Sequence, residues 1–131
     1  MVEVYIDGAS AGNPGLSGAG IFIKAGGEVE RFSLPLGIRN NHEAEFMALI
    51  KALEICRKRG YSIISVRSDS SAVVSAVEKE FAKKPMYRSL LKEALDLAKQ
   101  FDLFFIKWIP SSENKSADKL ARRAIALNNK L

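Results

Sequence analysis

The hydrophobic period of this chain changes near Asn41, and that change restricts the fold more than any other feature of the sequence. Before it, apolar residues form short runs that alternate or are rich in β-branched residues, which is typical of strands. The strands expected there span residues 2–7, 19–24 and 29–36, with a glycine-rich loop over residues 8–18 and a Gly26-Gly27 turn between the last two strands. From Asn41, apolar residues recur at helical spacing until Gly60.

The remainder of the chain alternates between the two periods. It predicts a buried strand over residues 63–66, a helix from Ser70 or Ser71, a helix from Pro85 to about Gln100, a strand over 103–109 and a final amphipathic helix over 114–128. The order βββαβααβα predicts an α/β fold with a five-stranded mixed sheet, its first three strands antiparallel and its later crossovers parallel. At 131 residues and 47% hydrophobic, the chain is expected to form one domain, residues 1–131.

Composition limits the environment and the class of partner. No apolar run is long enough to span a membrane, the N-terminus lacks a signal-peptide pattern, and the lone Cys56 lies in an apolar run. We therefore expect a cytoplasmic protein with a buried thiol and no membrane contact, and we expect a monomer. The net charge is +5, and residues 107–131 hold six Lys or Arg against two acids. This asymmetry favours a nucleic-acid partner, although a solvated basic helix face explains it equally well.

Two carboxylates are predicted on helix faces that should be apolar. Glu45 lies on the stripe of its helix that faces the sheet, where an isolated charge is costly to bury. Asp118 shares a face of the last helix with Ala121 and Ile125, and Arg122 is expected to lean away from that face. The alternative for both acids is an exposed position at the rim of the helix.

Two further carboxylates stand at the ends of strands that are expected to be neighbours. Asp69 follows the buried strand 63–66, and ligands bind at the carboxyl ends of such strands, but Asp69 is also a candidate helix N-cap. Asp7 precedes Gly8, and because Asp-Gly is a common turn pair, a purely structural role is also open for it. The joint placement of the four acids predicts one cluster.

Such a cluster needs a counterion. Neighbouring carboxylates repel, and their pKa values rise when nothing compensates their charge. Oxygen ligands without a His or Cys cluster favour Mg²⁺ or Mn²⁺ over zinc. Two such ions about 3.5 to 4 Å apart activate a water on one side of a phosphodiester and stabilise the leaving oxygen on the other. The candidate catalytic and metal-binding residues of a phosphodiester hydrolase are therefore Asp7, Glu45, Asp69 and Asp118.

Four segments carry a resemblance to a known family. They are residues 7–15 (Asp-Gly-Ala-Ser-Ala-Gly-Asn-Pro-Gly), 41–46 (Asn-His-Glu-Ala-Glu-Phe), 68–70 (Ser-Asp-Ser) and 114–121 (Asn-Lys-Ser-Ala-Asp-Lys-Leu-Ala). In order and spacing they resemble the signature segments of type 1 ribonucleases H, over nearly the whole chain. The resemblance implies the ribonuclease H fold, with helices on both faces of the sheet, and it places the family's Asp, Glu, Asp, Asp quartet on the four acids named above.

The resemblance also implies a substrate. The family cleaves the RNA strand of RNA–DNA hybrids, leaving 5′-phosphate and 3′-hydroxyl ends, and it recognises RNA through the 2′-hydroxyl. By that resemblance Asn13 and Asn41 sense RNA, and further substrate contacts come from Asn40, His42 and Asn114. Turn and cap chemistry is the alternative for Asn13 and Asn41.

The chain departs from the family pattern where substrate is held. Many members have Asn or Gln in place of His42 and Thr in place of Asn40, and residues 109–117 lack the histidine that bacterial relatives often carry before the last Asp. A basic handle is also missing, and we expect no hybrid-binding domain before Asp7. Part of the positive charge that such a handle carries is expected to come instead from Lys79, Lys83, Lys84 and Arg88. Hybrid binding is therefore expected to be weak and salt-dependent.

Three functions remain open at this point. The first is a metal-dependent endonuclease that hydrolyses the RNA strand of hybrids by a two-metal mechanism. The alternative is a catalytically weak or inactive nucleic-acid-binding module on the same fold, which the substituted substrate positions favour. The third is a nuclease of the same superfamily with another substrate, such as a DNA exonuclease.

Overall fold

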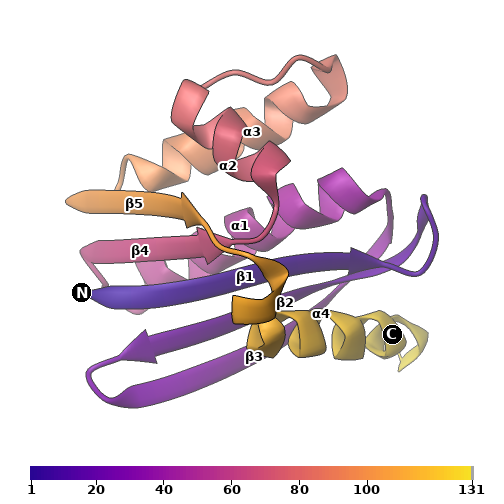
Figure 1. Ribbon diagram of the computed structural model, residues 1–131, viewed down its shortest axis with the longest axis horizontal. Coiled ribbons are helices and arrows are strands. Elements are labelled where there is room, and N and C mark those ends of the chain that lie inside the picture. The colour runs from indigo at the N-terminus through magenta and orange to yellow at the C-terminus, as the bar shows by residue number, and fades with distance from the viewer. Residues whose placement is uncertain (131) are drawn as a thin grey trace.

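The computed structural model describes residues 1–130 and shows one twisted sheet with helices packed on it (Figure 1). The strands are β1 (Val2–Ser10), β2 (Gly15–Ala25), β3 (Glu28–Arg39), β4 (Ile63–Ser68) and β5 (Leu103–Trp108). The helices are α1 (Asn41–Lys58), α2 (Ser71–Lys79), α3 (Pro85–Ala98) and α4 (Lys115–Leu127), with short 3₁₀ turns η1 (Ser111–Glu113) and η2 (Asn128–Lys130). The predicted element order is confirmed. None of the helices among these residues has the length and apolar character needed to cross a membrane.

The sheet has the strand order β3-β2-β1-β4-β5. β2 pairs antiparallel with both β1 and β3, whereas β4 pairs parallel with both β1 and β5. This is the predicted five-stranded mixed sheet, with its first three strands antiparallel. Ile6 of β1 pairs with Ser68 of β4, so the next residues along both strands, Asp7 and Asp69, emerge at the same edge of the sheet.

Two glycines allow helices to approach both faces of the sheet closely. A Cβ atom on Gly8 would overlap the backbone of Ala44 in α1, and one on Gly20 would overlap the carbonyl of Ala117 in α4. Gly8 pairs with Ala19, the neighbour of Gly20, so the two glycines face opposite sides of the sheet. α1 and α4 therefore cover opposite faces, as predicted, and α3 packs against α1.

The predicted loop over residues 8–18 is wrong in extent. β1 continues to Ser10 and β2 begins at Gly15, so only residues 11–14 connect the two strands. Gly8 and Gly18 lie within strands. They are glycines because α1 and α4 leave no room for a side chain there, and not because the backbone turns. The Gly26-Gly27 turn is confirmed, and both of its residues have positive φ angles of 57° and 83°.

α1 has the start and the end that its sequence predicts. Asn40 is the N-cap: its Oδ1 accepts from the Glu43 backbone N–H (2.8 Å), and the Glu43 carboxylate accepts from the Asn40 N–H (3.0 Å). This reciprocal pair is a capping box. Gly60 follows the helix with a φ of 75°, and Cys56 is fully buried on the inner face, as expected.

Candidate functional site

Three of the predicted carboxylates meet where β4 ends beside β1. Asp7 comes from β1, Asp69 follows β4, and Glu45 projects from the second turn of α1. Each offers one oxygen, and the three oxygens lie within 4.8 Å of one another. Asp7 is only 9% exposed, and the Glu45 side chain is 21% exposed. The alternative of an exposed position at the rim of the helix is therefore wrong for Glu45.

The cluster is electrostatically strained. The pKa of Asp7 is raised to about 8, first by burial and then by the charges of Asp69, Asp118 and Glu45. Burial also raises the pKa of Glu45, against the lowering effect of a hydrogen bond from Ser70 and of the nearby His42. A divalent cation would remove this repulsion, and a set of carboxylate oxygens is the kind of ligand that Mg²⁺ and Mn²⁺ prefer.

Asp118 faces the same site from the first turn of α4. Its charge contributes to the raised pKa of Asp7, and with Asp7 and Asp69 it lines a cavity of about 450 Å³. Its Oδ1 also accepts from the Arg122 Nε (3.2 Å), one helical turn further on, and Arg122 lines the cavity too. The Arg122 side chain is 74% exposed, as expected for a residue that leans away from the apolar stripe, and its i, i+4 spacing allows the guanidinium to reach back to Asp118.

Asn114 was expected among the substrate contacts, but it faces the interior. It is 1% exposed, and its Nδ2 donates to the Ile6 carbonyl (2.8 Å) and to the Asp69 Oδ2 (3.4 Å). It thus joins β1, the residue after β4, and the start of α4. Its buried Oδ1 has no hydrogen-bond partner among the described residues. The structure places Asn114 beneath the carboxylates, where it positions Asp69 and has no surface to offer to a substrate.

The structural alternatives for Asp7 and Asp69 are wrong. Asp7 lies inside β1 and pairs with Gly20, so it is not in a turn. The N-cap of α2 is Ser70, whose side chain accepts from the Val73 N–H, and Asp69 is left free of that role. The Ser70 hydroxyl also lowers the pKa of Glu45, which places it beside that carboxylate.

Sequence reasoning missed two residues of the site, Ser70 and Arg122. The signal for Ser70 was its place directly after Asp69. A hydroxyl that caps the next helix there lies at the same end of the sheet as the carboxylates. The signal for Arg122 was its i+4 spacing from Asp118.

The residues expected to contact substrate lie around the start of α1. Asn13 Oδ1 accepts from the exposed Asn41 backbone N–H (3.0 Å), and Asn41 lines the 450 Å³ cavity. The oxygen of Asn40 caps α1 and also accepts from the Tyr87 hydroxyl (3.2 Å). The His42 side chain is half exposed, with its Nδ1 3.7 Å from a Glu45 oxygen and its ring edge-on to Tyr87.

Comparison with known proteins places this geometry in a family. A family model described as "Reverse transcriptase-like" matches residues 6–124. The protein named "Putative hydrolase EbsB" of Enterococcus faecalis is 43% identical over 127 residues, which are 95% of this chain and 94% of that protein.

Solved structures agree with the family match. The crystal structure of RNase H1 from Halobacterium salinarum has a TM-score of 0.91 and 34% identity, over 95% of this chain and 97% of that one. LC11-RNase H1, solved in complex with an RNA/DNA hybrid, has a TM-score of 0.88 and 28% identity, over 96% and 97% of the two chains. With these matches along nearly its full length, and with the carboxylates gathered at the edge of the predicted sheet, this chain belongs to the ribonuclease H family.

Proposed function

We propose that this protein is a metal-dependent endonuclease that hydrolyses the RNA strand of RNA–DNA hybrids. The observation that carries the proposal is the cluster of Asp7, Glu45 and Asp69, whose oxygens lie within 4.8 Å of one another around a buried acid of raised pKa. Repelling carboxylates of this kind are costly to keep unless they bind cations. The hybrid bound to the structurally similar LC11-RNase H1 supports the substrate.

The donor set fits divalent ions of the hard type. Asp7, Glu45, Asp69 and Asp118 would hold two Mg²⁺ or Mn²⁺ ions through oxygen alone. Such ions, when bound, supply the activation of a water and the stabilisation of the leaving oxygen in phosphodiester hydrolysis. The open cavity of about 450 Å³ beside Asp7, Asp69 and Asp118 leaves room for the scissile phosphate.

Other residues of the chain hold the acids in place. The Asn114 amide donates to Asp69 from below, and the Ser70 hydroxyl lowers the pKa of Glu45 and so favours its charged form. Arg122 pairs with Asp118 at the rim of the cavity, where a guanidinium is also suited to a phosphate oxygen. The protein's contribution is thus an arrangement of charges that is set before substrate binds.

Recognition of RNA falls to the residues around the start of α1. Asn13 and Asn41 are both exposed, and their amide groups are short donors and acceptors of the kind that recognise a 2′-hydroxyl. The oxygen of Asn40 already accepts two hydrogen bonds, so only its NH₂ group is left for a substrate phosphate. His42 adds a half-exposed ring on the same turn.

A cleavage assay tests the proposal. Uniform RNA–DNA hybrid, duplex DNA and each single strand are end-labelled and incubated with the wild-type protein, in Mg²⁺ and in Mn²⁺ side by side. We expect internal cuts in the RNA strand of the hybrid that need a divalent ion, that disappear in Asp7→Asn, and that persist in the matched control Asp102→Asn, which changes an exposed acid at the far end of β5.

Three other outcomes contradict the proposal. Cleavage that survives Asp7→Asn would remove the carboxylate cluster from the mechanism. Tight hybrid binding without cleavage in either ion would assign the binding-module function. Stepwise release of nucleotides from duplex DNA would assign an exonuclease.

A further inference from the structure

The strand register places a row of cationic and aromatic side chains on the α4 side of the sheet. Cross-strand partners lie on the same face, and such pairs run across all five strands. From β3 to β5 the row consists of Arg31, Phe22, Tyr5, Arg67 and Lys107, and we call it the cationic row. It crosses four strand spacings, which is about 19 Å.

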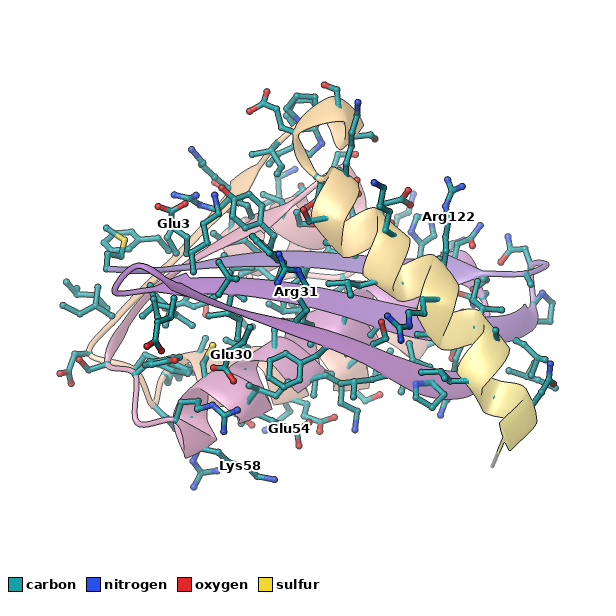
Figure 2. The ribbon with its side chains drawn as sticks, turned by 90° about the horizontal axis from the view of Figure 1, so that it is seen from below. Glu3, Glu30, Arg31, Glu54, Lys58 and Arg122 are labelled. Atoms are coloured by element: carbon teal, nitrogen blue, oxygen red, sulfur yellow. The ribbon has the colours of Figure 1, made fainter. Side chains whose placement is uncertain are left out.

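α4 does not pack on this row, whose two ends, Arg31 and Lys107, are exposed, whereas the Phe22 ring between them is buried. The helix packs on the next row, where it contacts Gly20 and where the Ser33 hydroxyl donates to the Leu120 carbonyl (2.8 Å). Figure 2 shows Arg31 over the strands beside α4. On β5 the same face carries two exposed apolar side chains, Leu103 at 50% and Phe105 at 47%.

The charges of the cationic row are largely free. Arg67 is neutralised by Glu3, with 2.6 Å between its Nη1 and the carboxylate. Lys24, Arg31 and Lys107 make no ion pair among residues 1–130. Lys24 is the cross-strand neighbour of Glu3 in the register of β1 and β2. It belongs to this surface because it lies next to the row on β2.

Aromatic rings lie beneath these cations. The Lys24 Nζ is 5.5 Å from the Tyr5 ring centroid, and the Arg31 guanidinium is 5.2 Å from the centroid of Phe22. Tyr5, Phe22 and Lys24 also line a hollow of about 180 Å³ that is closed on its other side by residues 112–116. Cations over aromatic faces next to a hollow form a surface that suits both phosphates and bases.

The surface adjoins the carboxylate cluster. Tyr5 lies two residues before Asp7 on the same face of β1, and the start of α4 separates the two. A strand that leaves the cavity past this end of α4 therefore reaches the cationic row without crossing to another face.

We propose that the cationic row, with Lys24 and Phe105, binds single-stranded nucleic acid. The free cations contact phosphates across the sheet, and the exposed ring of Phe105 stacks on a base. A single strand is favoured over a duplex because only unpaired bases offer their faces to an aromatic side chain. The proposal concerns binding alone and does not depend on cleavage at the carboxylates.

The contribution of the cations is tested by measuring binding in the absence of divalent ions. A fluorescently labelled oligothymidylate is titrated with the protein in EDTA, from 50 to 200 mM salt, and its anisotropy is measured. The test variant is Lys24→Gln/Arg31→Gln/Lys107→Gln. The matched control is Lys51→Gln/Arg57→Gln/Lys58→Gln, which removes three cations from α1, on the opposite face; Figure 2 shows Lys58 on that side.

We expect the test variant to bind at least about tenfold more weakly and to lower the slope of log K against log salt by about 2, since each lost phosphate contact accounts for about 0.7. The control should keep both values near those of the wild type. Equal losses in the two variants would show non-specific attraction and overturn the proposal, as would an acidic peptide that binds more tightly than the oligonucleotide.

The aromatic contact has its own matched pair. Phe105→Ala and Leu103→Ala remove side chains of almost equal exposure from the same face of β5. We expect Phe105→Ala to weaken binding about fivefold or more with an unchanged salt slope, because stacking is worth a factor of this size per base, and Leu103→Ala to change it less than about twofold. Equal effects would indicate a merely apolar surface and overturn the stacking. Hybrid cleavage is assayed separately. Loss of single-strand binding therefore does not count against the proposed nuclease activity, and loss of cleavage does not count against single-strand binding.

Discussion

Replacing Asp7 by Asn should make the metal-free protein more stable while it removes the proposed activity. Asp7 is 9% exposed, and its pKa is raised from an ordinary value of 3.8 to about 8 by burial and by the neighbouring acids. At neutral pH the folded protein must therefore either hold a proton that the unfolded chain has released or bury a repelled charge. The amide of Asn avoids both costs at almost the same volume.

The sign and the size follow from proton linkage. Between pH 3.8 and about 8 the folded state binds more protons than the unfolded state, so the free energy of unfolding falls as pH rises. At about 1.36 kcal/mol per pH unit, the cost at pH 7 reaches about 4 kcal/mol, and at pH 5 about 1.5 kcal/mol. Because the neighbouring acids share the titration, we expect Asp7→Asn to gain about 2 to 4 kcal/mol at pH 7 and clearly less at pH 5.

Urea denaturation of wild type and Asp7→Asn in EDTA, at pH 5 and at pH 7, measures these gains. Asp102→Asn is the control, since Asp102 is exposed and outside the cluster. Adding Mg²⁺ should stabilise the wild type and reduce the advantage of the variant, because an ion that binds only the folded state adds its binding free energy to stability. A variant that is less stable than wild type at pH 7, or a gain that does not change with pH, would refute the reasoning.

Three further predictions concern the groups that hold the cluster. Arg122→Gln should change stability by less than about 0.5 kcal/mol, because its ion pair is exposed, but should tighten Mn²⁺ binding a few-fold in calorimetry by freeing Asp118 and removing a positive charge from the cavity. Asn114→Ala should cost about 1 to 3 kcal/mol in urea denaturation, because it leaves a buried carbonyl of β1 without a donor. Gly8→Ala should cost at least about 2 kcal/mol, since its methyl group would overlap the backbone of Ala44 and α1 would have to move.

The fold was predictable because its signals are local. The change of period near Asn41, the Gly26-Gly27 turn and the end of α1 before Gly60 each report on a few adjacent residues, and the structure confirms them. The glycine-rich start of the chain was misread because a glycine that makes room for a helix looks the same in sequence as one that turns the backbone. Gly8 needs α1 to be placed before its role is visible.

The site was predictable only in its acids. A carboxylate on an apolar stripe, such as Glu45, conflicts with its surroundings, and that conflict is readable from spacing alone. Asn114 gave no such signal, because its buried hydrogen bonds to the Ile6 carbonyl and to Asp69 join segments that are 108 and 45 residues apart. The contact of Arg122 with Asp118 was not predicted, because helical spacing fixes the direction of a backbone position but not the reach of a long side chain.

The same glycines that were misread explain how the acids come together. Gly8 contacts α1 at Ala44, the residue before Glu45, and Gly20 contacts α4 at Ala117, the residue before Asp118. Gly20 is also the cross-strand partner of Asp7. Each helix is thus drawn to the sheet one residue before its carboxylate, and the two closest approaches flank Asp7 from opposite faces. Tight packing, which stabilises the fold, is therefore what forces the repelling charges into one place, and a bound cation would make the two demands compatible.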